Sequence, residues 1–522
     1  MEQTVIQKKK AVEFFLKKEI LVSSDLLAGI DDNSLDCLSR GMMGNEGNFL
    51  FLNNDLSEAV QKGQHRGINW IELESSKAFL ERGKDNKVYS EFLAILNTVK
   101  QKPAYEKVKV IFSHDEDSKK RDIQDFVKYF NARYQALEKI LKQRPDLRHV
   151  TAISRIKNKK DREEISLIGI VSDKQLTKNK NLVLTLEDPT GSINVIVNKN
   201  KPDVFEEAKS IVHDEVIAVT GVNGQNILFA NKIYWPEVIT KEIKKCKDEC
   251  YALFLSDIHV GSKNFLPESF NKFLAWLNGT TGSESQKELA SKVKYIFIAG
   301  DLVDGVGVYP NQDKELEIKD IYGQYEECAR LLGQIPKNIS VIICPGNHDA
   351  IRGAEPQPAL YADFAKAIYQ IPNILCLSNP CFVNIHSSED FSGFDVLLYH
   401  GYSFDYFVAN VDAIRNNGGY NRADLIMKFL LKRRHLAPTH TSTLYVPEET
   451  QDPLVIGKVP DFFVTGHVHK SIAANYRNIT LISGSCWQSK TSFQEKVGHN
   501  PEPGRVPMVN LKTREIKILK FL

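Results

Sequence analysis

Long apolar segments are missing from this chain of 522 residues. No stretch approaches the roughly 20 consecutive apolar residues that a membrane-spanning helix needs, so we expect no contact with a membrane. The first ten residues also lack the apolar core of a secretory signal. The sequence therefore predicts a protein of the cytoplasm.

Cysteine is scarce, with 8 residues in the whole chain. Most of these cysteines lie inside apolar, strand-like segments such as Ile342–Cys344, which is typical of free thiols in a reducing compartment. Cys246 and Cys250 form a single CxxxC pair. Because this pair is only half of an ordinary zinc site and no second pair accompanies it, we interpret the segment as a solvated linker.

The chain also lacks a strong charge of either sign, since 68 lysine and arginine residues nearly balance 66 aspartate and glutamate residues. No global field attracts nucleic acid, and any such binding must come from local basic patches. With 42% hydrophobic and 26% charged residues, the composition is that of a soluble globular protein. The length is too great for one hydrophobic core and predicts about three domains.

The N-terminal part of the chain contains two predicted units. Residues 1–70 are expected to form a small helical domain, because apolar residues recur there at helical spacing: Val12, Phe15, Leu16 and Ile20. We interpret this stripe as facing a core, with a docking surface for a partner as the alternative. Residues 71–120 are polar and weakly periodic, so we expect a flexible linker.

A change of period follows along the chain. Residues 121–146 have helical spacing and predict a connecting helix, whereas residues 150–240 alternate apolar and polar positions on either side of a turn at Asp188–Gly191. This series of short strands favours a five-stranded OB barrel. Such a barrel either binds single-stranded nucleic acid or serves as a packing module. The basic loop Lys174–Asn181 favours binding, and the shortage of exposed aromatic residues favours packing.

Residues 248–522 alternate short apolar strands with helical segments, as a layered α/β domain requires. A strand-end aspartate is usually a turn former, and a lone buried histidine is usually a core residue, so one polar motif after one strand would carry little weight. Ligands in open α/β sheets collect at the carboxyl ends of strands. Here five motifs each follow an apolar strand: Ser256–His259, Gly300–Asp304, Pro345–Asp349, His400–Gly401 and Gly466–His469.

The residue types in these motifs indicate a centre with two metal ions. Asp257 and His259 lie two residues apart and can hold one ion together. Asp301 can bridge two ions through its two oxygens, which implies ions roughly 3.5–4 Å apart, the spacing of two-metal phosphatases and nucleases. Carboxylate, imidazole and amide groups without thiolate suit manganese, zinc or iron. We take two manganese ions as the first expectation, with magnesium, zinc or iron as alternatives.

His348 is the candidate general acid of this centre. In a two-metal hydrolysis a hydroxide attacks phosphorus while both ions hold the non-bridging oxygens. His348 lies beside Asn347 and can point at the leaving oxygen. Asp304 is expected to orient the imidazole of His348, as a carboxylate commonly does.

The series SDIH, GDLVD, PGNHD, HG and GHVH resembles the calcineurin-like metallophosphoesterases. Further segments resemble the small subunits of archaeal DNA polymerase D, and together they cover about residues 120–490. These segments are Asp125–Asn131, Leu186–Gly191, Gly305–Pro310, Ala354–Ala359 and Lys432–Pro438.

This resemblance implies an OB domain ahead of a calcineurin-like sandwich of two sheets flanked by helices. It also implies a 3′–5′ proofreading exonuclease of the nucleoid, which acts on DNA 3′ ends beside a large catalytic subunit. The sliding clamp is a further candidate partner, although the tail Ile516–Leu522 lacks the glutamine and paired aromatics of a clamp peptide. The implied ligands are Asp257, His259, Asp301 and His469 for the first ion, and Asp301, Asn347, His400 and His467 for the second.

Three functions remain as alternatives at this point. As a proofreading subunit, the chain would bind DNA phosphates through Arg352 and the cluster Lys432–Arg434, and a solvated surface is the alternative for that cluster. As a scaffold subunit, it would carry a vestigial metal site, against which the complete ligand set argues. As a phosphoesterase for other phosphate esters, it would have no use for the OB domain.

Overall fold

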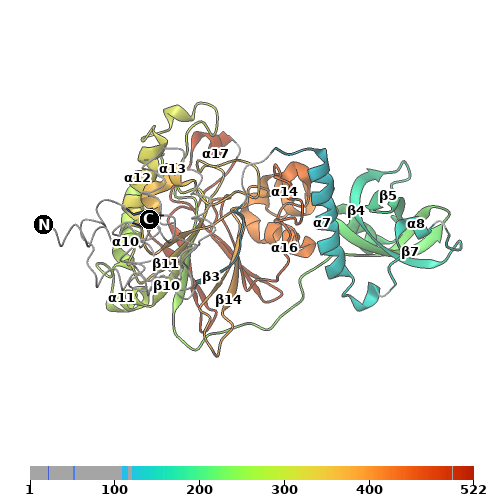
Figure 1. Ribbon diagram of the computed structural model, residues 1–522, viewed down its shortest axis with the longest axis horizontal. Coiled ribbons are helices and arrows are strands. Elements are labelled where there is room, and N and C mark those ends of the chain that lie inside the picture. Colours follow the sequence, from blue (N-terminus) through green and yellow to red (C-terminus); the bar gives the residue numbers. More distant parts are fainter. Residues whose placement is uncertain are drawn as a thin grey trace. The chain divides into compact units, whose positions relative to one another are not determined.

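Figure 1 shows the computed structural model of the chain, which describes residues 21–22, 51–52 and 108–522 apart from 116–119, 148, 157 and 497. Except for two short strands, the predicted helical domain 1–70 lies outside the described residues, as does most of the predicted linker 71–120. The chain divides into two units, Met1–Pro103 and Ala104–Leu522. In the first unit, β1 (Leu21–Val22) pairs in parallel with β2 (Phe51–Leu52).

Five strands of the second unit close into a barrel in the order β4-β5-β6-β8-β7. Alternate side chains such as Leu184 and Val195 are fully buried inside it, because successive side chains of a strand point to opposite faces. The predicted five-stranded OB barrel is confirmed. Its strands are β4 (Glu164–Leu176), β5 (Leu182–Asp188), β6 (Gly191–Val197), β7 (Val216–Gly224) and β8 (Ile227–Tyr234), with α9 (Pro202–Lys209) between β6 and β7.

The first of two six-stranded sheets has the order β12-β11-β10-β9-β18-β19. Its central strands β9, β10 and β11 run parallel to one another, so their carboxyl ends meet at one edge. The strands are β9 (Tyr251–Leu255), β10 (Val293–Ala299), β11 (Ser340–Cys344), β12 (Ile374–Cys376), β18 (Arg505–Asn510) and β19 (Ile516–Lys520).

The second sheet has the order β16-β17-β15-β14-β13-β3. Here β14 and β15 are parallel neighbours, and their carboxyl ends lie at the same edge of this sheet. The strands are β3 (Val108–Ser113), β13 (Cys381–Ile385), β14 (Phe394–Leu398), β15 (Phe462–Thr465), β16 (Ile472–Tyr476) and β17 (Ile479–Ser483).

The two sheets pack face to face around a shared apolar core. The ring of Phe254 on β9 stacks on Phe297 of β10 at 5.3 Å between centroids and on Phe462 of β15 at 6.0 Å. The alternate residues Leu253 and Leu255 face the opposite way, into a second core beneath helices. Because both faces of these strands are buried, the strands are apolar throughout.

Helices cover the outer face of each sheet. Those on the first sheet are α10 (Pro267–Leu277), α11 (Glu284–Ser291), α12 (Ile321–Leu332) and α13 (Ala362–Tyr369). Those on the second are α7 (Ile123–Leu141), α14 (Phe404–Asn410), α15 (Asp412–Arg415) and α16 (Ala423–Arg433). Short helices α8 (Ile153–Ile156) and α17 (Ser492–Lys496) complete the described set, together with turns of 3₁₀ helix at Pro145–Leu147, Gln312–Lys314, Gly419–Arg422 and His440–Ser442.

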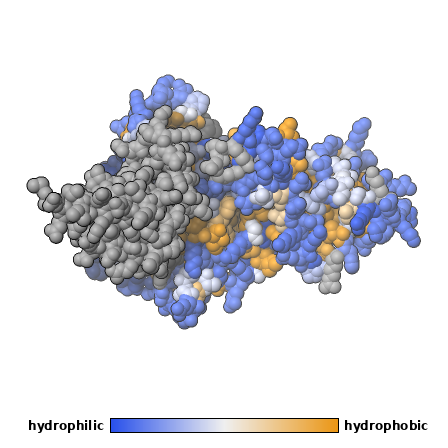
Figure 2. Space-filling model, in the orientation of Figure 1, coloured by the Kyte–Doolittle hydropathy of each residue, from blue (hydrophilic) through white to orange (hydrophobic). Residues whose placement is uncertain are grey.

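Among the residues coloured by hydropathy in Figure 2, most of the visible surface is hydrophilic and the hydrophobic residues form separate patches. None of the helices within the described ranges is long and apolar enough to cross a membrane. Apolar side chains are instead concentrated between and behind the sheets.

The prediction of a flexible linker up to residue 120 is wrong at its C-terminal end. Residues Val108–Ser113 form β3, which pairs antiparallel with β13 at the edge of the second sheet. The segment Val-Lys-Val-Ile-Phe-Ser is rich in β-branched and aromatic residues, which favour a strand. The sequence prediction missed this strand because the residues around it are polar.

For Arg433 and Arg434, the prediction that the cluster Lys432–Arg434 binds DNA phosphates is also wrong, and so is the alternative of a solvated surface. Arg433 is buried and forms an ion pair with Glu215, which directly precedes β7 of the barrel. Arg434 is buried as well, and its Nε donates to the carbonyl of Ile456 at 2.6 Å. The two guanidinium groups therefore have protein partners, and Arg433 joins α16 to the barrel.

A buried ionic network holds α7 in place. Arg133 of α7 and His435 both contact the Asp452 carboxylate, with Arg133 Nε 2.6 Å and His435 Nε2 2.8 Å from Oδ2. The hydroxyl of Tyr129 donates to Oδ1 of Asp452 at 2.7 Å. Burial alone would raise the pKa of Asp452, but Arg133 and His435 outweigh it and hold that pKa below its ordinary value. A carboxylate with three side-chain partners is thus the centre of the contact.

We predict that Asp452→Ala lowers the free energy of unfolding by about 3–5 kcal/mol, because it leaves the buried Arg133 without its counter-ion. Glu449→Ala is the matched control, since Glu449 pairs with Lys128 of the same helix at an exposed position and such pairs contribute about 0–1 kcal/mol. Urea unfolding followed by circular dichroism measures both. Equal effects of the two substitutions would contradict the network's role.

Candidate metal centre

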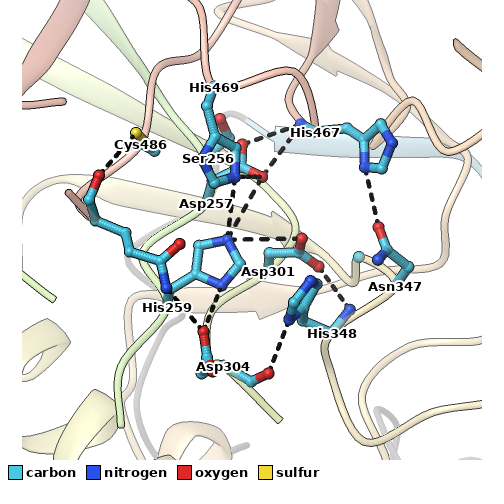
Figure 3. A network of polar contacts seen from close by, with 12 residues as sticks. Ser256, Asp257, His259, Asp301, Asp304, Asn347, His348, His467, His469 and Cys486 are labelled. Atoms are coloured by element: carbon cyan, nitrogen blue, oxygen red, sulfur yellow. Dashed lines mark hydrogen bonds and ion pairs between the residues drawn. The ribbon is translucent and has the colours of Figure 1, made fainter. Parts of the chain in front are cut away.

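All seven predicted ligands gather where the strand ends of the two sheets meet, and Figure 3 labels each of them except His400. Three strands of the first sheet, β9, β10 and β11, deliver the motifs with Asp257, Asp301 and Asn347. Two strands of the second sheet, β14 and β15, deliver His400 and His467. The site is therefore built from both sheets, and each strand supplies polar groups only after its apolar run has ended.

The first group of donor atoms surrounds Asp257. The Nε2 atom of His469 lies 3.3 Å from Oδ1 of Asp257, and Nε2 of His259 lies 4.0 Å from the same oxygen. The two Nε2 atoms are 3.2 Å apart. Oδ2 of Asp301 completes the group at 3.9 Å from His259 Nε2. These are the four residues implied for the first ion.

The second group lies on the other side of Asp301. Nε2 of His400 is 3.3 Å from Oδ2 of Asp301 and 2.9 Å from Oδ1 of Asn347. Nδ1 of His467 approaches the same amide oxygen at 3.1 Å. These are the residues implied for the second ion, and the Asp301 carboxylate belongs to both groups.

The backbone at the ligands is unusual. Asp257, His259, Asp301, His467 and His469 all have positive φ, between 52° and 67°. Residues other than glycine seldom adopt this left-handed conformation, which costs roughly 1–3 kcal/mol each and clusters at functional sites. Gly346 is required for a steric reason, because a Cβ there would lie 2.1 Å from Oδ1 of Asp301.

Three of the ligand imidazoles have one nitrogen beside an acceptor outside the centre. Nδ1 of His400 donates to the carbonyl of Ala299 at 2.7 Å, and Nδ1 of His259 lies 3.2 Å from Asp304 Oδ1. Nε2 of His467 lies 3.2 Å from Asp405 Oδ2. An acceptor outside fixes the proton on the outer nitrogen and leaves the inner nitrogen free to bind a metal.

The electrostatics of the cluster favour charged carboxylates. Burial alone would raise the pKa of Asp301, but His400 and His348 outweigh it and hold that pKa well below its ordinary value. For His400, burial lowers the pKa, yet Asp301 and Asp257 dominate and raise it to about 10. Two buried carboxylates thus draw positive charge to the cluster, which is what a cation would supply.

The donor set fits a pair of hard or borderline divalent ions. It combines carboxylate oxygens, imidazole nitrogens and one amide oxygen, and it contains no thiolate ligand. Manganese, magnesium, iron and zinc accept such sets. With two divalent ions bound, the seven side chains would hold them, and Asp301 would contact both.

The expected contact between the Asp304 carboxylate and His348 is wrong. Oδ1 of Asp304 faces His259 instead, and its oxygens accept from the side chains of Gln312 and Gln488. The backbone carbonyl of Asp304 accepts from Nδ1 of His348 at 2.8 Å. Asp304 therefore orients both imidazoles, one with its side chain and the other with its main chain.

Sequence reasoning missed two carboxylates at the centre. Asp349 is buried, accepts from the backbone amides of Gly346 and Leu302, and supports the turns that carry Asn347 and Asp301. Burial and the nearby Asp301 raise the pKa of Asp349 to about 7. The position of Asp349 in the GNHD motif could have identified this carboxylate from the sequence. Asp405 gave no such signal, because it meets His467 only in the folded chain.

A groove of about 580 Å³ opens beside His348. Its lining includes Val306, Val308, Tyr402 and Leu444, all of which are exposed apolar or aromatic residues. Arg352 does not line this groove. Its guanidinium donates to the carbonyl of Pro356 and contacts His114, so its predicted binding of DNA phosphates stays a prediction.

We predict that Asp405→Asn weakens Mn²⁺ binding roughly 10–100-fold, the usual effect of removing an outer partner of a ligand histidine. Isothermal titration measures the affinity. Asp412→Asn is the control, because Asp412 is a highly exposed carboxylate on the neighbouring α15. Unchanged affinity in the Asp405 variant would show that this carboxylate does not act on the centre.

Comparisons with known proteins agree with this architecture. The family model for the B subunits of DNA polymerases alpha and epsilon matches residues 252–473, and the model of an OB-fold nucleic acid binding domain matches residues 165–223.

Individual relatives identify the family more narrowly. The DNA polymerase II small subunit of Methanothermobacter thermautotrophicus is 41% identical over 400 residues, which cover 77% of this chain and 80% of that protein. The Pyrococcus furiosus protein of the same name is 40% identical, with 76% of this chain and 64% of that protein covered. The one from Methanocaldococcus jannaschii is 42% identical, with 74% and 64% covered. The chain therefore belongs to the small subunits of archaeal DNA polymerase II, the family D polymerase.

Proposed function

We propose that the chain is the proofreading 3′–5′ exonuclease subunit of a replicative DNA polymerase, hydrolysing phosphodiester bonds at DNA 3′ ends. One observation carries the proposal. Oδ2 of the buried Asp301 lies 3.9 Å from His259 Nε2 and 3.3 Å from His400 Nε2, so a single carboxylate can serve two ions. The complete set of donors on both sides supports a working centre rather than a vestigial one.

Two divalent ions bound here, with manganese as the first candidate, supply the activation of water and the stabilisation of charge on the phosphate. The remaining steps of the reaction depend on side chains of the protein. His348 is the proposed general acid. Because its Nδ1 bonds to the carbonyl of Asp304, Nε2 is the nitrogen left to carry a proton to the leaving 3′ oxygen.

The groove beside His348 supports a substrate with an unpaired end. Tyr402 is 40% exposed there, and an exposed aromatic ring can stack on a base. The neighbouring Val306, Val308 and Leu444 add an apolar wall. A frayed, mismatched 3′ nucleotide offers its base to such a wall, whereas a paired base is already stacked in the duplex.

The layered fold supports the same proposal. Two sheets packed face to face, with helices outside each, suit a calcineurin-like metallophosphoesterase domain over residues 248–522. The OB barrel within residues 150–240 would then bind DNA or the partner. The relatives named above are small subunits, so we take a large polymerase subunit as the partner of this chain.

We predict that His348→Ala lowers the rate of hydrolysis roughly 10²–10⁴-fold, the usual contribution of a general acid, while Mn²⁺ binding is retained. Asp301→Ala is expected to abolish both. Degradation of a 3′-mismatched, end-labelled DNA primer measures the rate, and titration calorimetry measures the metal. His213→Ala is the control, since His213 is exposed and outside the centre.

Stepwise loss of 3′ nucleotides by the parent chain would establish the nuclease. Equal loss of metal and activity in His348→Ala would contradict its role as the acid. No cleavage by the parent chain, even with the large subunit added, would contradict the proposed function and favour a scaffold subunit.

A further inference from the structure

Cys246 and Cys250 lie in the segment that leads from the barrel to β9. Residues 235–250 are all described and contain neither helix nor strand. The two cysteines are nevertheless buried, with exposed fractions of 6% and 3%, so the prediction of a solvated linker is wrong for them, although residues 247–249 between them are exposed. The segment is held down because the amide of Cys246 donates to the carbonyl of Leu511, whose own amide donates to the carbonyl of Cys250.

His386 joins the two cysteines from the other sheet. It directly follows β13, is 7% exposed and has a positive φ of 61°. Each of its ring nitrogens lies 3.9 Å from Sγ of Cys250. Ligand atoms of Cys246, Cys250 and His386 all lie within 4.8 Å of one another. Residues more than 130 positions apart are thus brought together.

The two nitrogens of His386 have different partners. Nε2 lies 3.1 Å from Oδ2 of Asp248, the residue between the two cysteines in sequence. Nδ1 lies 3.1 Å from the hydroxyl of Tyr295. A proton on Nδ1 can be donated to that hydroxyl, which leaves Nε2 deprotonated, facing the carboxylate and able to bind a metal ion. A metal-bound histidine usually has such an outer partner.

We propose that Cys246, Cys250 and His386 bind a structural zinc ion, and that the Asp248 carboxylate, which is 68% exposed and touches His386, turns inward to supply the fourth ligand when zinc binds. Tetrahedral zinc with ordinary bond lengths places a sulfur and a nitrogen ligand about 3.5 Å apart, and a nitrogen and an oxygen ligand about 3.3 Å apart. The observed separations of 3.9 Å and 3.1 Å lie within a few tenths of these values. Binding converts both thiols to thiolates, and their two protons pass to solvent.

The sulfur ligands separate this site from the centre at Asp301. Thiolates select zinc, whereas carboxylate and amide oxygens suit manganese or magnesium. The sites also lie at opposite ends of β9, since Cys250 precedes Tyr251 and Asp257 follows Leu255. The zinc ion would therefore pin the start of β9 to the end of β13. It would join the two sheets without taking part in hydrolysis, so this proposal does not rest on the proposed function.

Cobalt(II) provides a direct test, because thiolate-bound cobalt has a charge-transfer absorption in the near ultraviolet that oxygen and nitrogen ligands do not give. The full chain, reduced and stripped of metal, is titrated with CoCl₂. We expect the band to be complete within about three equivalents, because the two-ion centre at Asp301 also takes up cobalt, and to disappear when ZnCl₂ is added, because zinc binds thiolate sites more tightly than cobalt does.

Three variants assign the band. Cys246→Ser/Cys250→Ser is expected to lose it completely. Cys376→Ser and Asp301→Asn should keep it, since Cys376 belongs to the core of the first sheet and Asp301 to the other centre. Absence of the band in the parent chain would overturn the proposal even if a variant failed to fold. So would a band that survives in the double cysteine variant, or an intact mass lower by two hydrogens, which would mean a disulfide.

Discussion

The buried carboxylate of Asp301 is the constraint on which the rest of this structure depends. An ionised carboxylate in an apolar interior costs several kcal/mol unless partners surround it. Here Oδ1 accepts from the backbone amide of His348 at 2.8 Å, and Oδ2 faces His259 and His400. His400 comes from the second sheet, so that sheet must pack closely on the first for the charge to be compensated.

The packing of the two sheets brings His400 close to Asp301 and also makes the centre rigid. Phenylalanine rings from both sheets stack on one another in the core between the sheets. Strands β9 and β10, which lead to two of the ligand motifs, are buried on both faces. Because these strands are packed on both sides, their contacts can offset the backbone strain of the five ligand residues at positive φ that follow strand ends. Strain in the backbone thus lies where the strands end and the chemistry begins, an arrangement that positions side chains more precisely than flexible loops would.

The ligand motifs could be predicted because each relationship is local: a strand, then polar residues one or two positions beyond it. The barrel was predictable for the same reason, since alternation within β5 and β6 reports burial directly. Pairings across the fold were not predictable. Asp405 meets His467, Asp304 turns to His259, Arg433 pairs with Glu215 and His386 meets Cys250 only after folding. β3 was missed because an edge strand needs its partner β13 to be recognised.

Anomalous diffraction from a crystal of the full chain grown with Mn²⁺ tests the two-metal centre most directly. We expect two manganese peaks roughly 3.5–4 Å apart, with the Asp301 carboxylate between them, Asp257, His259 and His469 around one, and Asn347, His400 and His467 around the other. A single peak, or two peaks of which only one touches Asp301, would contradict a centre in which one carboxylate serves both ions.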